Sequence, residues 1–257
     1  MRILHFHTKW NIPEAAVFDF DGTLSKLRAG WEQVMEPLMC ECIPGDPAEV
    51  QAMVHRYIDD STGIQTIFQM RWLAEEIQHR GGKAEDPWTY KDEYNRRLMQ
   101  EVQRRRDAVI SGAEPAERYF VPGGREFLQI LHEKGVRMYA ASGTDEEDVR
   151  AEAEVLGFSK FFEEISGAER GTDRCSKKAV LRRLVKPGSR LLVVGDGKVE
   201  IALGREAGAL TLGIASMDAP GYPAGVINQQ KFNRLQAVGA HAIAADFTER
   251  EELLTWI

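Results

Sequence analysis

Four short apolar segments, each ending at once in small or polar residues, constrain the fold of this chain more than any other feature. The segments are AAVFDF before DGT, VRMYAA before SGT, RLLVV before GDG and ALTLGIA before SMD. Runs of this length with β-branched residues and glycine-rich exits are typical of strands buried on both faces, as in a parallel sheet. Ligands of such sheets bind beyond the carboxyl ends of the strands, so we expect the DGT, SGT and GDG exits to converge on one pocket.

Amphipathic helical patterns fill the intervals between these segments. GGREFLQILHEKG ends at Gly135, and DEEDVRAEAEVLGF begins with acidic residues and ends at Gly157. Acidic first turns and glycine stops are typical of helix ends. The C-terminal stretch indicates a helix, a last strand with Asp246 at its exit and a final helix. Strands and helices that alternate through short connections predict an α/β fold, a doubly wound, Rossmann-like parallel sheet.

One long segment interrupts the alternation. Residues 29–115 contain no strand-like run and instead carry amphipathic stretches such as PAEVQAMVHRYI and IQTIFQMRWLAEEIQ, which predict helices. We therefore expect an inserted, smaller, all-helical cap domain at 29–115, and a Rossmann-like core formed by residues 1–28 and 116–257. An insert that leaves the sheet beside the first strand exit is expected to act as a lid over the pocket.

The first strand exit, VFDFDGTLS, carries two aspartates one residue apart. Side chains alternate between the faces of a strand, so Asp19 and Asp21 point one way while Phe18 and Phe20 point the other. Two like charges aimed at one place are costly unless a cation or a substrate lies there. The pair therefore indicates a metal-assisted site, whereas taken alone it is also compatible with a capping or turn pair.

Four motifs, each at a strand exit or a helix start, follow one another along the chain. They are Asp19-Phe20-Asp21-Gly22-Thr23-Leu24, Ser142 in YAASGT, Lys177 in CSKKAVL, and Asp196 with Glu200 in VVGDGKVEI. Together they resemble the ordered motifs of the haloacid dehalogenase-like (HAD) hydrolases, and the resemblance covers essentially the whole core. The place of the helical insert is similar to that in members with a cap after the first strand.

The resemblance implies a two-step phosphoryl transfer. Asp19 would be the nucleophile that attacks phosphorus and becomes an aspartyl-phosphate, which divides one difficult displacement into two easier steps. Asp21 would protonate the leaving alkoxide and then activate the water that hydrolyses the intermediate.

A magnesium ion fits the same motifs. The site that they form offers carboxylate and backbone oxygens and no histidine or cysteine ligands, and hard cations such as Mg²⁺ prefer oxygen ligands. By resemblance, Asp19, the backbone carbonyl of Asp21 and Asp196 bind the Mg²⁺ ion, with Glu200 in the outer shell.

Fixed donors are needed for the phosphoryl oxygens, because these oxygens carry negative charge in the transition state. Ser142 supplies a hydroxyl, Gly143 and Asp21 offer backbone N–H groups, and Lys177 supplies a positive charge. Lys177 precedes the apolar positions of its helix by three and four residues, which favours it over the neighbouring Lys178. Taken alone, Ser142 would be an N-cap of the acidic helix that follows it.

Substrate choice is expected to depend on the insert and on the chain that leads to it. In IDDSTGIQTIFQM, residues 58–70, a polar corner directly before an apolar helix predicts a helix N-cap. The same stretch offers Thr62, Gln65 and Thr66 as hydroxyl and amide groups for a polyhydroxylated substrate; a cap that only starts its helix is the alternative. Arg28, just past the first motif, either meets a second anionic group of the substrate or braces the linker.

Composition and charge argue against several other classes. The net charge of −7 and the pI near 5.5 argue against general affinity for nucleic acid or acidic membranes. The first residues lack an apolar core of signal-peptide length, and no window reaches the roughly 18 residues of a membrane span, so we expect a cytoplasmic protein. Three cysteines without a zinc-like spacing are expected to be reduced. His5 and His7 are expected to be partly buried or surface residues rather than ligands.

These observations together predict a Mg²⁺-dependent phosphatase. Its expected substrate is a small phosphorylated metabolite resembling a sugar phosphate, because a lid of this size would exclude protein-sized substrates. No nucleic-acid or membrane partner is expected, and the chain is expected to be a monomer or a homodimer. Two alternatives remain open: a phosphomutase or phosphotransferase of the same fold, and a binding module that kept the fold without turnover.

Overall fold

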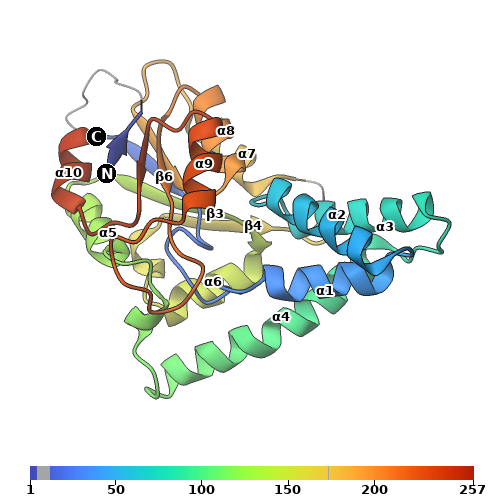
Figure 1. The fold of residues 1–257 in the computed structure, drawn as a ribbon. Helices are drawn as coiled ribbons and strands as arrows, with labels where there is room; N and C mark the ends of the chain where they lie inside the picture. Colours follow the sequence, from blue (N-terminus) through green and yellow to red (C-terminus); the bar gives the residue numbers. More distant parts are fainter. Residues whose placement is uncertain (5–11, 173) are drawn as a thin grey trace. The chain divides into compact units, whose positions relative to one another are not determined.

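A twisted sheet with helices on both faces and a group of long helices are the main elements of the protein (Figure 1). This computed structural model describes residues 1–4, 12–172 and 174–257. The expected surface or partly buried positions of His5 and His7 lie outside the described residues.

The chain divides into two units. The first, which we call the α/β unit, contains residues 1–29 and 106–257, and the second, which we call the helical unit, contains residues 30–105. The second border falls inside α4 (Pro87–Ile110), a continuous helix, and so precedes the end of the insert that the sequence places at residue 115.

Among the described residues, seven strands form one sheet in the order β1-β7-β6-β5-β2-β3-β4. They are β1 (Arg2–Ile3), β2 (Ala15–Phe18), β3 (Arg137–Asp145), β4 (Glu164–Ala168), β5 (Leu191–Gly195), β6 (Leu210–Ile214) and β7 (Ala242–Ala244). Neighbouring strands are parallel except β1, which is antiparallel to β7. The predicted α/β fold is therefore confirmed, and β2 lies between β3 and β5, as the convergence of their exits requires.

Helices cover both faces of this sheet (Figure 1). One face packs against α5 (Gly124–Glu133), α6 (Glu146–Val155) and α10 (Arg250–Trp256), and the other against α7 (Ser176–Leu184), α8 (Lys198–Glu206) and α9 (Gln229–Ala237). Alternation along β2 produces the two layers, because Ala16 and Phe18 join the first core while Ala15 and Val17 join the second. All four side chains are buried, which explains the continuous apolar run in the sequence.

Two strands of the sheet, β1 and β4, are not predicted from the sequence. β4 is an edge strand whose sequence, EISGA, contains the half-exposed Glu164 and Ser166, so it lacks the apolar run that marks the inner strands. β1 has only two residues. Short 3₁₀ turns, η1 (Ala116–Tyr119) and η2 (Ser159–Phe161), complete the connections.

The helical unit contains α1 (Glu32–Cys42), α2 (Pro47–Asp60), α3 (Thr66–His79) and most of α4, and no strand lies within residues 30–105. Side chains from all four helices form its own apolar core; buried examples are Met35, Met39, Val54, Met70, Leu73, Tyr94, Leu98 and Val102. Asp46 caps α2 by accepting hydrogen bonds from the backbone N–H groups of Ala48 and Glu49, both at 3.1 Å.

The predicted N-cap in the corner before α3 is wrong. Ser61 is the C-cap of α2, and the hydroxyl of Thr62 donates to the carbonyl of Ile58 at 3.0 Å. The N-cap position of α3 is Gln65, whose side chain makes no capping hydrogen bond. Hydroxyl side chains bond backwards to helix carbonyls as readily as forwards to N–H groups, so this polar corner ends one helix rather than starting the next.

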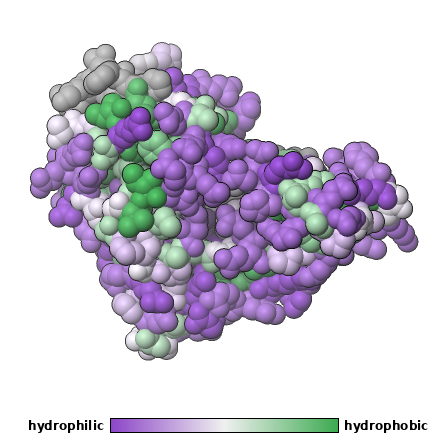
Figure 2. All heavy atoms as spheres, viewed as in Figure 1, coloured by the Kyte–Doolittle hydropathy of each residue, from purple (hydrophilic) through white to green (hydrophobic). Residues whose placement is uncertain are grey.

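The surface is largely hydrophilic on the face shown in Figure 2, where hydrophobic side chains gather in one group over the α/β unit. Ile3, Val226 and Ile227 are among the exposed large hydrophobic side chains of that unit. No helix in the described part of the chain is both long enough and apolar enough to cross a membrane.

Candidate active site

The two aspartates of the first motif lie directly beyond the central strand β2. The backbone N–H of Asp19 donates to the carbonyl of Val194 at 2.9 Å, which extends the pairing with β5 by one residue. Gly22 follows in the left-handed region with φ of +79°, and a Cβ atom there would lie 2.1 Å from Asp196 Oδ2. Position 22 therefore requires glycine, because any side chain there would clash with Asp196, which follows β5.

A cluster of buried carboxylates lies at these exits. Asp19, Asp196 and Glu200 each present an oxygen such that the three oxygens lie within 4.8 Å of one another. The hydroxyl of Thr23 lies 3.4 Å from Asp19 Oδ2 and 3.4 Å from Asp196 Oδ1. An all-oxygen set of three close carboxylates suits a hard divalent cation, so the donor set fits Mg²⁺.

Lys177 lies against this cluster. Its ammonium is 2.8 Å from Asp19 Oδ1 and donates to Glu200 Oε2 at 2.7 Å. Burial lowers the pKa of Lys177, but the two carboxylates outweigh burial and hold that pKa above its ordinary value. The neighbouring Lys178 is exposed, so Lys177 is the lysine that the fold brings to Asp19.

Asp21 is held by the exit of β3. Its Oδ2 atom accepts hydrogen bonds from the hydroxyl of Ser142 at 3.0 Å and from the hydroxyl of Thr144 at 2.8 Å. The N-cap position of the acidic helix α6 is Asp145, not Ser142. Gly143 lies between the two hydroxyl residues near the end of β3. The contact from Thr144 is not anticipated by the sequence, in which this residue resembles a simple helix cap.

Arg28 belongs to the same region but points its charge at protein carboxylates. Its Nε and terminal nitrogen donate to Glu152 Oε1 at 2.9 and 2.7 Å, and the terminal nitrogen donates to Asp148 at 3.0 Å. Arg28 Nε is also 4.0 Å from Asp21 Oδ1. Of the two predicted roles, this geometry corresponds to bracing the linker.

Burial raises the pKa of Glu152, which has no exposed surface, to about 7. The nearby Arg28 opposes this rise, but Asp21 and Asp148 compete for the same single guanidinium. One cation shared by three carboxylates does not offset complete desolvation of the carboxylate that is most deeply buried.

Two further buried lysines, Lys231 and Lys26, lie beside the acidic cluster, and neither belongs to a motif that the sequence indicates. Lys231 Nζ donates to Asp196 Oδ2 at 2.6 Å and to Asp218 Oδ1 at 2.5 Å. Lys26 Nζ donates to the hydroxyl of Ser216 at 2.7 Å and to the carbonyl of Gly22 at 3.2 Å. The one available signal is that Lys231 lies on the apolar face of its helix, four residues before the core residue Leu235.

The residues predicted to select the substrate belong to the helical unit. Gln65 is buried at the start of α3, while Thr62 and Thr66 are half-buried. The part of these three residues in substrate recognition stays a prediction.

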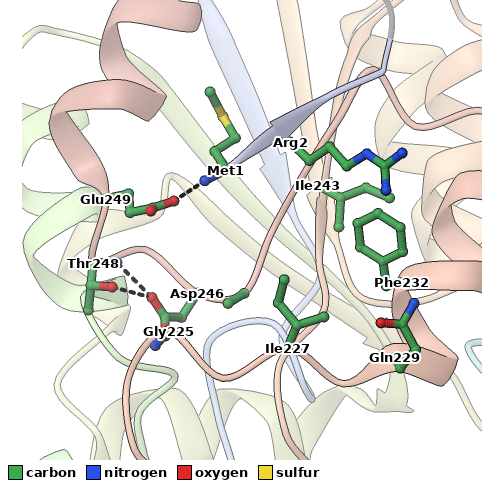
Figure 3. Close-up of a pocket in the computed structure, with 11 residues that line it drawn as sticks. Met1, Arg2, Gly225, Ile227, Gln229, Phe232, Ile243, Asp246, Thr248 and Glu249 are labelled. Atoms are coloured by element: carbon green, nitrogen blue, oxygen red, sulfur yellow. Dashed lines mark hydrogen bonds and ion pairs between the residues drawn. The ribbon is translucent and has the colours of Figure 1, made fainter.

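A separate cavity of about 280 Å³ lies beside β1 and β7 (Figure 3). It is lined by residues such as Arg2, Ile227 and Phe232, and contains none of the predicted site residues. Asp246, at the exit of β7, accepts from the backbone N–H of Gly225 at 2.6 Å and thereby fixes the loop before α9. This cavity is therefore distinct from the acidic cluster.

The chain is similar to known proteins over most of its length. The family model of the haloacid dehalogenase-like hydrolases matches residues 13–208. The chain is 26% identical over 202 residues to a phosphoglycolate phosphatase of Rhodospirillum rubrum, with 77% of each chain covered.

Solved structures share the fold at lower identity. A predicted phosphoglycolate phosphatase of Haemophilus somnus superimposes with a TM-score of 0.61 at 15% identity, covering 96% of this chain and 99% of that one. A predicted beta-phosphoglucomutase of Bacteroides vulgatus gives a TM-score of 0.60 at 17% identity, with coverage of 96% and 90%.

Proposed function

Because the chain belongs to the haloacid dehalogenase-like hydrolases, we propose that it removes the phosphoryl group of a small phosphorylated metabolite through an aspartyl-phosphate at Asp19. The family and the relation to a phosphoglycolate phosphatase make it a phosphoric monoester hydrolase. The observation that carries the mechanism is the contact of Lys177 with both Asp19 and Glu200, beside Asp196.

Asp19 is the nucleophile in this proposal. A carboxylate oxygen of Asp19 forms a bond to phosphorus as the bond to the leaving oxygen breaks. Lys177 fixes one oxygen of Asp19 and places a permanent positive charge where the phosphoryl oxygens gather negative charge. Ser142 and Gly143, at the exit of β3, supply the further donors for these oxygens.

Asp21 moves the proton in both steps. It first gives a proton to the leaving alkoxide, and then takes one from the water that attacks the aspartyl-phosphate, which releases inorganic phosphate and restores Asp19. The hydroxyls of Ser142 and Thr144 hold Oδ2 of Asp21. Oδ1 accepts no hydrogen bond from the described residues, which leaves that atom as the proton carrier.

A divalent cation, which we take to be Mg²⁺, would be held by Asp19, Asp196 and the backbone carbonyl of Asp21, with Glu200 behind them. When bound, it supplies positive charge to the phosphoryl oxygens and makes the proximity of the carboxylates tolerable. The close all-oxygen cluster supports this assignment.

The substrate that we propose is a small phosphorylated metabolite resembling a sugar phosphate. Thr62, Gln65 and Thr66 of the helical unit, proposed as the cap, offer the polar groups that would select it. Phosphoglycolate, the substrate in the name of the Rhodospirillum rubrum relative, is a necessary member of any test set. A cytoplasmic location and a monomeric or homodimeric state accompany this proposal.

The test is release of inorganic phosphate from phosphoglycolate and a panel of sugar and polyol phosphates, with and without Mg²⁺, and with Asp19→Asn as the control. The proposal expects selective release that needs the metal and is lost in the variant. Transfer of the phosphoryl group to another position of the substrate, without release, would instead identify a phosphomutase. If no substrate analogue or phosphate mimic binds with Mg²⁺, the chain is a binding module of another kind.

A further inference from the structure

Lys231 and Thr23 lie near different oxygens of the Asp196 carboxylate. Asp196 Oδ2 accepts from the Lys231 ammonium at 2.6 Å, whereas Asp196 Oδ1 lies 3.4 Å from the hydroxyl of Thr23. The same hydroxyl is 3.4 Å from Asp19 Oδ2. The two oxygens of Asp196 therefore differ in their surroundings: Oδ2 contacts Lys231, and Oδ1 lies near the Thr23 hydroxyl, which also neighbours Asp19.

The lysine is itself fixed by a chain of contacts. Lys231 is 3% exposed, and its ammonium donates to Asp218 Oδ1 at 2.5 Å. The other oxygen of Asp218 accepts from Asn228 Nδ2 at 2.9 Å, and the Asn228 side-chain oxygen caps α9 by accepting from the backbone N–H groups of Gln230 and Lys231. The start of α9 is thus built to hold this one ammonium in place.

We propose that Lys231 is a positioning residue for the metal site: it fixes the carboxylate of Asp196 so that Oδ1 faces the position between Asp19 and Glu200. Asp218 and Asn228 in turn orient Lys231. The proposal rests on the proposed metal-binding role of the acidic cluster and assigns the affinity of that cluster for a divalent cation in part to α9. Substitution of a group that hydrogen-bonds to a metal ligand and orients it commonly weakens metal binding by about 10- to 100-fold.

Lys231 affects cation binding in two opposite ways: its orientation of Asp196 strengthens binding, and its positive charge weakens it. Whether loss of Lys231 weakens or tightens binding therefore shows which effect is larger. An ammonium near a metal site repels the incoming cation, and its removal by itself would tighten binding. Asp218, however, contacts the same ammonium at 2.5 Å, and its negative charge opposes this repulsion. Without Lys231, Asp218 would keep its ion pair with Lys26 at 3.9 Å, but Asp196 would lose the contact at Oδ2 and with it its orientation. The positioning effect is therefore the larger.

The test measures cation binding rather than turnover. Mn²⁺ and Mg²⁺ are titrated into the substrate-free protein by calorimetry, for the wild type, Lys231→Met, and Lys178→Met as a control that removes an exposed lysine. Lys231→Met is expected to bind both ions about 10-fold or more weakly, and Lys178→Met as the wild type does. At saturating Mg²⁺, Lys231→Met is expected to regain a large part of the wild-type kcat, because its defect lies in holding the ion.

Two further variants keep the test decisive if Lys231→Met folds poorly. Asp218→Asn retains the ammonium but removes its anchor, and is expected to weaken binding by a smaller factor. The double variant Lys231→Met with Asp218→Asn removes both charges together, and is expected to remain weak because Asp196 is still not oriented.

Binding by Lys231→Met as tight as, or tighter than, that of the wild type would overturn the proposal, as would wild-type affinity in the double variant. A wild type that binds neither ion would overturn the proposed metal site as well, and so separates the two failures.

Discussion

Lys177 Nζ lies 2.8 Å from Asp19 Oδ1. The ammonium comes from the first turn of α7 and the carboxylate from the exit of β2, so the sheet topology, not the local chain, brings them together. The proposed mechanism makes this ammonium a fixed charge beside the phosphoryl group, and removing one such donor commonly costs about 100- to 1,000-fold in rate.

Lys177→Met is accordingly expected to lower kcat/KM for the best substrate by at least about 100-fold. Lys178→Met, which removes an exposed charge from the same helix turn, is the matched control and is expected to leave kcat/KM unchanged. Equal losses in the two variants would show that general charge, and not the contact with Asp19, supports the rate.

Gly22 and Gly135 offer a second matched pair. Both have positive φ, +79° and +77°, but a Cβ at Gly22 would meet Asp196 at 2.1 Å, whereas one at Gly135 would meet nothing within 4 Å. Gly135→Ala is expected to lose only backbone strain, about 1–2 kcal/mol of the free energy of unfolding. Gly22→Ala is expected to lose more and also to lower activity, because Asp196 must move. Denaturant unfolding and a rate assay measure both, and full activity in Gly22→Ala contradicts the placement of Asp196.

The strands β2, β3, β5 and β6 and the acidic cluster are the parts that sequence predicts well. Buried inner strands need apolar residues on both faces, and the motifs of the family are contiguous in sequence, so both leave a local signal. The edge strand β4 leaves none, since two of its five residues, Glu164 and Ser166, are polar and partly exposed.

Contacts between distant segments are the parts that the sequence does not predict. Lys231 meets Asp196 and Asp218 only because α9 packs beside β6 and β7, and each residue taken alone resembles a surface charge. Thr144 is similar: its hydroxyl is available both to cap a helix and to bind Asp21, and only the distance of 2.8 Å decides.

Thr144→Val tests that contact with Asp21. Loss of one of two hydrogen bonds to Oδ2 is expected to cost about 1 kcal/mol, or roughly a 5- to 10-fold fall in kcat, since Asp21 would be held less firmly in both proton transfers. Thr255→Val is the control, because the Thr255 hydroxyl donates to a carbonyl of its own helix on the surface. A kcat for Thr144→Val equal to that of the control would assign Thr144 no part in orienting Asp21.

The buried Glu152 predicts a pH dependence of stability. Its pKa is raised from 4.5 to about 7 by burial, so the folded state binds its proton more tightly than the unfolded state does. The stabilisation from this proton is complete below pH 4.5 and is lost as the pH rises through about 7. At 1.36 kcal/mol per pKa unit the loss is of the order of 3 kcal/mol.

Unfolding of the wild type and Glu152→Gln at a series of pH values measures this effect. The free energy of unfolding of the wild type, relative to that of the variant, is expected to fall between pH 4.5 and 7. Glu154→Gln, at an exposed position of the same helix, is expected to follow the wild type. If the free energy of unfolding of the wild type, relative to that of Glu152→Gln, instead stays constant between pH 4.5 and 7, Arg28 keeps Glu152 ionised over this range.

The central claim is that Asp19 carries the phosphoryl group between the two steps. Its most direct test is to quench the protein in acid during turnover of a substrate labelled in the phosphoryl group, and to locate the label by peptide mapping. The account predicts label on the peptide of Asp19, none in Asp19→Asn, and more label in Asp21→Asn than in the wild type if that variant still forms the intermediate. Undiminished phosphate release by Asp19→Asn, with no labelled protein in any variant, would contradict it.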